Sequence, residues 1–223
     1  MVLFHGSKNI IVKPVYGAGN PMNDYGLGLY CTENIELAKE WACTENRNGY
    51  ANQYELDVEG LAVCRLLEPE YHILNWLAVL LRNREFATST RLSREAKEYI
   101  LSTFLPDLDG YDVIIGYRAD DSYFRFAKSF LNGSISLQQL SRAMKLGNLG
   151  EQVVLVSEKA FSHLTFSRYE EADGSIYWGK RETRDSGARK QFDMMVDSTS
   201  VSDGIYILDI LREKWNNDEP RLR

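Results

Sequence analysis

The sequence predicts an α+β fold, because its apolar runs of strand length and its longer amphipathic stretches do not alternate regularly. Regular alternation would instead indicate a doubly wound parallel sheet. Two further features define the organisation, a helical insert between about residues 65 and 107 and an extension over about residues 174–223. With 223 residues, of which 44% are hydrophobic, the chain is long enough for a sizeable core. We expect a single domain over residues 1–223.

The N-terminal part is expected to supply two strands and a helix. Val2–Phe4 is a short apolar run, and turn-forming residues separate it from a second strand that follows Gly26 and Gly28 and ends at Thr32. Thr32 is predicted to cap a helix, because acidic residues occupy the turn after it. That helix should bury one face, since its apolar residues recur at spacings of three and four: Ile35, Ala38, Trp41 and Ala42.

The middle of the chain mixes strand and helix patterns. "YANQYELDVEGLAVCRLL" has the alternation and the turn residues of a strand or a hairpin. An apolar stripe from Ile73 to Leu81 predicts a helix, and a second helix is expected over Ser93–Phe104, where Pro106 stops it. The β-branched run "YDVIIGY" then predicts a strand bounded by turn residues.

The last part begins with two expected helices, Phe124–Phe130 and Leu137–Met144, joined by an Asn–Gly turn. "EQVVLVS" predicts the next strand, and "AFSHLTFSRY" is expected to extend the sheet. The extension contains an amphipathic helix around Phe192 and a final apolar run, "GIYILDIL".

Composition excludes several classes of protein. The formal net charge of −6 argues against a protein that binds nucleic acid without specificity. Cys31, Cys43 and Cys64 are odd in number and lack CxxC spacing, which favours reduced thiols in a reducing cytosol. The N-terminus has no leader pattern, and the most apolar stretch, Tyr71–Leu81, is too short to span a bilayer. We therefore expect a soluble, cytoplasmic protein with no membrane partner.

Common catalytic motifs are missing from the sequence. "GLGLY" lacks the third glycine of a dinucleotide fingerprint, and neither a P-loop nor a GxSxG elbow occurs. His72 and His163 have no partner at metal-ligand spacing, so both are expected to be structural and no metal is predicted. For His5, taken alone, a hydrogen-bonded histidine at a strand end is the commoner explanation.

Two aromatic residues stand eleven positions apart, Tyr30 at a strand end and Trp41 in the helix that follows. This spacing lets two rings face each other across a slot, where stacking would hold a flat heteroaromatic ring. The simpler alternative is that Trp41 anchors the buried face of its helix.

Three segments resemble the signature segments of the ADP-ribosyltransferase superfamily. "LFHGS" resembles its histidine-glycine-serine strand, "DYGLGLYCTENIELAKEWA" its glycine-rich approach to a tyrosine, and "GEQVVLVS" the strand that opens with the catalytic glutamate. The resemblance is to the histidine–tyrosine–glutamate branch, which includes poly-ADP-ribose polymerases and diphtheria-like toxins. The whole chain also resembles an uncharacterised bacterial family of predicted ADP-ribosyltransferase toxins, whose members often sit beside small antitoxin-like genes.

This resemblance implies a split β-sheet core, mixed or antiparallel, and NAD as co-substrate with no metal. It places His5 at the adenine-side ribose, the backbone of Gly6 at the nicotinamide carboxamide, and Ser7 at a further hydroxyl contact. Tyr30 and Trp41 would clamp the nicotinamide ring. His5 and Tyr30 are thus expected in catalysis as well as in NAD binding.

The catalytic position of the third segment is open between Glu151 and Gln152. The resemblance to the bacterial family places Gln152 there, and a glutamine supplies hydrogen bonds without a charge. The lost carboxylate disfavours chain-forming polymerase activity and implies a mono-ADP-ribosyltransferase that modifies a protein or a nucleic acid. Such a protein would be a bacterial toxin of a toxin–antitoxin or phage-defence system, with a small antitoxin protein as a partner.

Other functions remain open at this stage. The main alternative is a catalytically inactive module of the same fold that binds NAD or ADP-ribose. An RNA-repair phosphotransferase of the same superfamily is disfavoured, because its histidine- and arginine-based signature is missing. Asp120 and Asp121 would either line the cleft or form a turn. Five basic residues of the extension would contact phosphates or form a solvated helix face: Lys180, Arg181, Arg184, Arg189 and Lys190.

Overall fold

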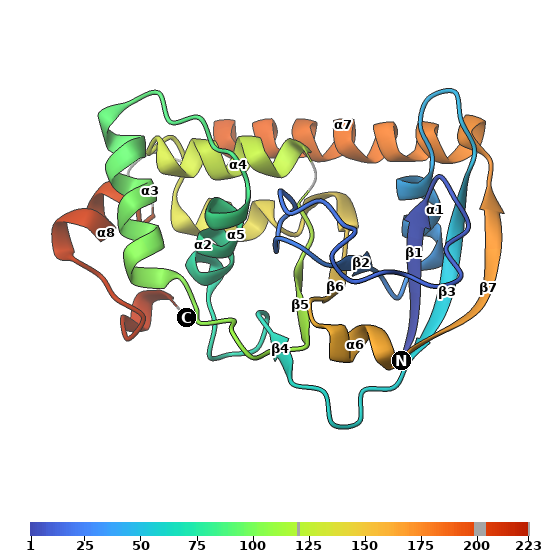
Figure 1. Cartoon of the computed structure of the whole chain (residues 1–223). Coiled ribbons are helices and arrows are strands. Elements are labelled where there is room, and N and C mark those ends of the chain that lie inside the picture. Colours follow the sequence, from blue (N-terminus) through green and yellow to red (C-terminus); the bar gives the residue numbers. More distant parts are fainter. Residues whose placement is uncertain (120, 199–203, 223) are drawn as a thin grey trace. The chain divides into compact units, whose positions relative to one another are not determined.

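The computed structural model describes residues 1–119, 121–198 and 204–222, apart from the side chains of residues 121 and 122. Helices and strands are mixed without regular alternation, which confirms the α+β prediction (Figure 1). The chain forms two compact units. The sheet unit comprises Met1–Arg65, Leu108–Gly116 and Gly150–Arg184, and the helical unit comprises Leu66–Asp107, Tyr117–Leu149 and Asp185–Arg223.

The first sheet of the sheet unit is antiparallel and contains β1 (Val2–Ser7), β3 (Gly49–Leu56) and β7 (Leu164–Ala172) in the order β1-β3-β7. β1 is longer than the predicted Val2–Phe4 and includes the whole "HGS" segment. "AFSHLTFSRY" extends this sheet only through β7, because its first part forms the short helix α6 (Glu158–Ser162).

The second sheet has the order β2-β6-β5-β4, from β2 (Leu29–Cys31), β6 (Glu151–Leu155), β5 (Val113–Tyr117) and β4 (Val63–Arg65). It is mixed, because β2 pairs antiparallel with β6 while β4 pairs parallel with β5. β3 and β4 therefore lie in different sheets, and the hairpin considered for this stretch does not form.

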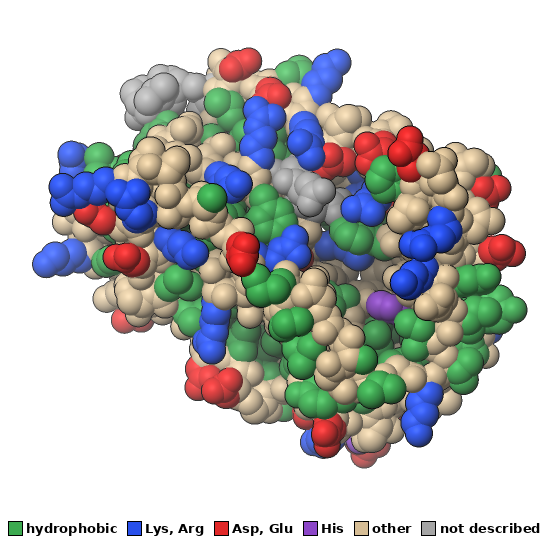
Figure 2. Space-filling model, turned by 45° about the horizontal axis from the view of Figure 1, so that its top comes forward, with side chains coloured by type: hydrophobic (Ala, Val, Ile, Leu, Met, Phe, Trp, Pro, Cys, Tyr) green, Lys and Arg blue, Asp and Glu red, His purple; other side chains and the backbone are tan. Residues whose placement is uncertain are grey.

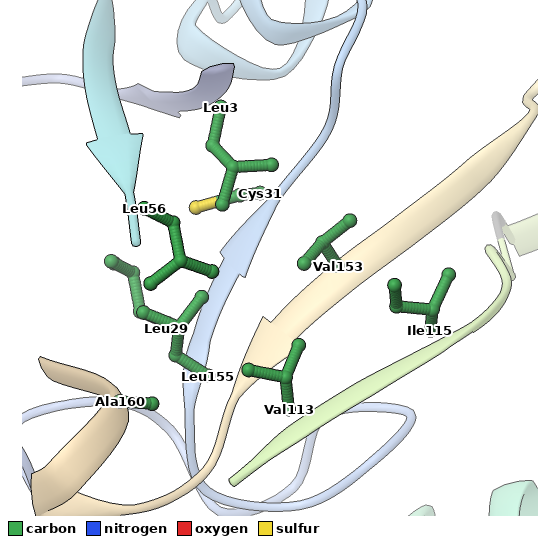
Figure 3. Packing of buried hydrophobic residues seen from close by; sticks show 9 residues of the cluster. All are labelled: Leu3, Leu29, Cys31, Leu56, Val113, Ile115, Val153, Leu155 and Ala160. Atoms are coloured by element: carbon green, nitrogen blue, oxygen red, sulfur yellow. The ribbon is translucent and has the colours of Figure 1, made fainter. Parts of the chain in front are cut away.

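The two sheets meet where β1 passes the end of β2. The backbone N–H of Phe4 donates to the carbonyl oxygen of Thr32 at 2.8 Å, and the N–H of Thr32 donates to the carbonyl of Phe4 at 3.0 Å. A shared core lies between the sheets, and Figure 3 shows its side chains pointing toward one another from β1, β2, β3, β5, β6 and α6. Its buried members are Leu3, Leu29, Cys31, Leu56, Val113, Ile115, Val153, Leu155 and Ala160.

Helix α1 (Ile35–Ala42) packs on the first sheet at two glycines. A Cβ atom on Gly6 would lie 2.1 Å from the carbonyl oxygen of Ala38, and one on Gly49 would lie 2.1 Å from that of Ala42. The predicted N-cap at Thr32 is wrong. Asn34 caps α1, because its side chain accepts from the backbone N–H groups of Glu36 and Leu37 in the first turn.

The helical unit confirms most of the predicted helices. The apolar stripe forms α2 (Ile73–Asn83), and the next helices are α3 (Arg91–Phe104), α4 (Asp121–Leu131) and α5 (Leu137–Ala143). The final apolar run forms α8 (Ile207–Glu213). Short 3-10 turns occur at Leu146–Asn148 and Pro220–Leu222.

The amphipathic helix predicted in the extension is part of a longer helix, α7 (Gly174–Ser198). Its residues up to Arg184 belong to the sheet unit, and the following ones belong to the helical unit. Within the described ranges, no helix combines the length and the apolar character that crossing a membrane requires.

Candidate functional site

A cavity of about 420 Å³ opens in the sheet unit. This volume is within the range of small-molecule sites. Its wall contains His5 of β1, Leu29 and Tyr30 of β2 and Phe161 of α6, and the rest of the lining comes from the segment 11–28 between β1 and β2. Two of the predicted site residues, His5 and Tyr30, thus line one cavity.

His5 and Tyr30 are in direct contact. Nδ1 of His5 lies 2.8 Å from the backbone carbonyl oxygen of Tyr30. A carbonyl oxygen only accepts hydrogen bonds, so Nδ1 carries the proton and donates. In the neutral ring Nε2 is then the acceptor, and this contact fixes both the tautomer and the ring orientation.

The hydroxyl group of Tyr30 holds the turn that precedes β2. It accepts from the backbone N–H of Tyr25 at 3.0 Å and donates to the carbonyl oxygen of Gly26 at 2.6 Å. Gly26 has a φ of 78°, which glycine adopts without strain. Asn23 lies at the start of this turn and lines the cavity.

Glu151 and Gln152 differ sharply in environment. Glu151 is exposed, whereas Gln152 is 2% exposed. Nε2 of Gln152 donates to Oδ2 of Asp24 at 3.1 Å, and Asp24 is itself buried. Because Tyr30 pairs with Val154 across β2 and β6, Gln152 is a diagonal neighbour of Tyr30 on the same face of the sheet.

Gly6 presents its backbone at a strand edge. The N–H and C=O groups of alternate residues in an antiparallel strand point to the same edge. Phe4 bonds to Thr32 on the edge away from β3, so the N–H and C=O of Gly6 lie on that edge too. The side of Gly6 where a Cβ would stand is filled by α1, which is why the packing requires glycine there.

Asn52 anchors the start of the cavity-lining segment. This side chain is fully buried on β3, opposite His5. Its amide group donates to Oγ of Ser7 at 3.1 Å and to the carbonyl of His5 at 3.2 Å, and its oxygen accepts from the backbone N–H of Ile11 at 2.8 Å. The hydroxyl of Ser7 also bonds to the carbonyl of Asn9, so Ser7 fixes the chain as it leaves β1.

Trp41 is not among the described residues that line the cavity. The guanidinium of Arg181 lies 4.7 Å from the centre of the Trp41 ring and 5.5 Å from that of Trp178. Trp41 is on α1 between Ala38 and Ala42, so it flanks the helix face that packs on Gly6.

The basic residues of the extension lie on α7, and several are paired with carboxylates. Nζ of Lys180 is 3.0 Å from Glu36, and its hydrogen bond lowers the pKa of Glu36. Nε of Arg184 donates to Glu40 at 3.0 Å. On the face that Figure 2 shows, Lys and Arg side chains lie interspersed with acidic and hydrophobic ones. Paired cations of this kind offer less charge to a phosphate than an unpaired strip would.

Two residues of this region were not predicted from the sequence. Asn52 could have been noticed in the sequence, because it is a polar residue at a position where the strand pattern is otherwise apolar. Asp24 could not, because it resembles any acidic residue of a turn. Asp120 and the side chain of Asp121 lie outside the described residues. Within the described residues, no three His, Cys, Asp or Glu side chains are grouped to hold a metal ion.

One protein-family model matches residues 1–166 of the 223, and its description reads protein of unknown function (DUF3990). The matched part contains His5, Tyr30, Trp41 and Gln152. No curated protein and no solved structure matches the chain.

Proposed function

The chain belongs to the DUF3990 family, and we propose that it is a mono-ADP-ribosyltransferase. It would cleave NAD and transfer ADP-ribose to a macromolecular acceptor. The proposed fold is the split sheet of ADP-ribosyltransferases, with the two sheets meeting at Phe4 and Thr32.

The observation that supports this proposal most is the convergence of three segments that are remote in sequence. His5 of β1 bonds to the backbone of Tyr30 of β2, and Tyr30 lies diagonally across the sheet from Gln152 of β6. These are the three segments that resemble the signature of the superfamily. A cavity of ligand size adjoins the first two.

The resemblance assigns the proposed NAD-binding roles, and the shared cavity lining of His5 and Tyr30 supports two of them. Nε2 of His5, the acceptor of its neutral ring, would bind a hydroxyl of the adenine-side ribose. The backbone edge of Gly6 would pair with the nicotinamide carboxamide, and Tyr30 and Trp41 would enclose the nicotinamide ring. Lys13 lines the cavity and would face the pyrophosphate.

The proposed reaction is cleavage of the N-glycosidic bond of NAD. The bond between C1′ of the ribose and the nicotinamide nitrogen breaks, and its electron pair leaves with nicotinamide. Positive charge then spreads over C1′ and the ring oxygen, as in glycoside hydrolysis. The site would contribute by holding the dinucleotide bent and by placing preorganised polar groups near C1′. A nucleophile of the acceptor finally bonds to C1′.

Incubation with NAD labelled in its adenylate part tests this proposal. The pure protein and a bacterial lysate should release nicotinamide and transfer the label to macromolecules. Protease and nuclease digestion of the products then separates protein from nucleic-acid acceptors. Lack of both nicotinamide release and label transfer would count against the proposal. Growth arrest on expression in bacteria, relieved by loss of NAD cleavage, is the outcome expected of a toxin.

A second candidate is favoured by one observation, the uncharged Gln152 at the third position. A module that only binds NAD or ADP-ribose needs no carboxylate. Calorimetry separates the two functions, because the module binds NAD tightly and releases no nicotinamide over hours.

A further inference from the structure

We propose that Asp24 supplies the catalytic carboxylate that position 152 lacks, an inference that rests on the proposed function. Nε2 of Gln152 donates a 3.1 Å hydrogen bond to Oδ2 of Asp24. Both side chains are buried, Gln152 at 2% and Asp24 at 7% exposure. The amide therefore holds a carboxylate beside the place where the superfamily carries its own glutamate.

Hydrogen bonds between other groups close the turn that contains Asp24. An aspartate in a turn commonly bonds to a backbone N–H two residues further on. Here the N–H of Gly26 donates to the carbonyl of Asn23 at 2.9 Å, and the N–H of Tyr25 donates to the hydroxyl of Tyr30. The turn is closed by these bonds, while the Asp24 side chain reaches across to β6.

The turn is also held at the cavity. Tyr30 fixes it through two hydrogen bonds of its hydroxyl group, and both Tyr30 and Asn23 line the cavity. The two residues that hold this segment, Tyr30 and Gln152, both stand at catalytic positions by resemblance. Their common effect is to fix the position of one acidic side chain.

Burial of the Asp24 carboxylate costs free energy, and it also strengthens the interaction of that carboxylate with a positive charge. A charged carboxylate loses its hydration in a buried site, and this cost is compensated only by partners. In the same low-dielectric surroundings its attraction for a developing positive charge is much stronger than in water. The transition state for loss of nicotinamide carries such a charge on the ribose.

In the proposed step the C1′–nitrogen bond of NAD breaks and its electron pair leaves with nicotinamide. The carboxylate of Asp24 stabilises the cation at C1′. An oxygen or nitrogen nucleophile of the acceptor then forms the new bond to C1′ and passes its proton to Asp24, from which it returns to solvent. Gln152 acts as a positioning residue that orients Asp24.

The test measures nicotinamide release from NAD, with a bacterial lysate as the source of acceptors. It compares the wild type, Asp24→Asn, the double variant Asp24→Asn with Gln152→Glu, and Asp57→Asn as a control on an exposed aspartate of the sheet unit. We expect Asp24→Asn to lower kcat at least about a hundredfold. Its KM for NAD and its Tm should stay near those of the wild type and of the control.

The double variant returns a carboxylate to the other end of the same hydrogen bond. It should recover nicotinamide release at least about tenfold over Asp24→Asn. If Asp24→Asn is unstable, recovery of Tm in the double variant without recovery of nicotinamide release overturns the role of Asp24. An active wild type with an equally active Asp24→Asn also overturns it. A wild type that releases no nicotinamide overturns the proposed function and this inference with it.

Discussion

Nδ1 of His5 lies 2.8 Å from the backbone oxygen of Tyr30, so a side chain of one sheet holds the backbone of the other. On β1, His5 directly follows Phe4, whose backbone bridge to Thr32 joins the two sheets. The contact of His5 with Tyr30 therefore serves two purposes in the proposed enzyme: it fixes the gap between the sheets, and it leaves the ring in one tautomer.

His5→Ala should weaken NAD binding by about 1–1.5 kcal/mol through the loss of one hydrogen bond to the ribose, and nicotinamide release should fall with it. The matched control is His163→Ala, because Nδ1 of His163 also lies against a backbone carbonyl, that of Asp57, at 3.1 Å. Calorimetry with NAD measures both variants. Equal effects of the two changes would mean that His5 only joins the two sheets.

Trp41→Ala should weaken NAD binding by roughly 1–3 kcal/mol, from lost stacking and apolar burial, and Trp41→Phe should retain most of the binding. Trp178→Ala is the matched control, because Trp178 also contacts the guanidinium of Arg181. If Trp41→Ala changes Tm but has the same Kd for NAD as Trp178→Ala, Trp41 only packs against Arg181 and does not bind NAD.

Gly6→Ala should destabilise the protein by about 1–3 kcal/mol or more, because the added Cβ would lie 2.1 Å from the carbonyl oxygen of Ala38 and force α1 away from β1. Gly179→Ala is the opposite case. Gly179 lies within α7 with no atom near its Cβ position, so alanine should stabilise the helix by about 0.5–1 kcal/mol. Denaturant unfolding measures both, and a Gly6→Ala variant as stable as the wild type would contradict this packing.

Asp112 should contribute to the free energy of unfolding at neutral pH and lose this contribution at acid pH. Its hydrogen bond from Ser157, at 2.6 Å, is the largest cause that lowers its pKa, and the backbone N–H of Ala62 adds a second at 2.9 Å. A carboxyl whose pKa is lowered by folding stabilises the folded state above its unfolded pKa of about 4. That contribution is lost as the pH falls through the lower, folded pKa.

The measurement compares how the free energy of unfolding of the wild type and of two variants depends on pH. Between about pH 5 and pH 2, the free energy of unfolding should fall more steeply for the wild type than for Asp112→Asn. Ser157→Ala should also flatten the pH dependence, although it also removes the N-cap of α6 and therefore lowers stability at every pH. Parallel pH curves for the wild type and both variants would contradict this account of Asp112.

The sequence predicted those elements whose pattern is set by local burial. The stripe from Ile73 to Leu81 predicted α2 because nearly every apolar side chain of that helix is buried. The cap of α1 was misplaced at Thr32, since Thr32 and Asn34 are both good capping residues. Only the fold shows that Thr32 is engaged with Phe4.

Pairing between remote segments was harder to predict. β4 has three residues, and nothing in so short a run specifies a parallel partner such as β5 rather than its neighbour β3. The same holds for the site. Asp24 and Gln152 are 128 positions apart, and an aspartate two residues before a glycine looks like an ordinary turn residue.

The most direct test of the central claim is the rate of nicotinamide release from NAD by the wild type, Gln152→Ala and Glu151→Ala. The wild type should release nicotinamide and modify an acceptor. Gln152→Ala should be slower by about a hundredfold or more, because it removes a preorganised polar contact in the site. Glu151 is exposed, so Glu151→Ala should stay close to the wild-type rate. Absence of release by the wild type, or the reverse ranking of the two variants in folded protein, would contradict the account.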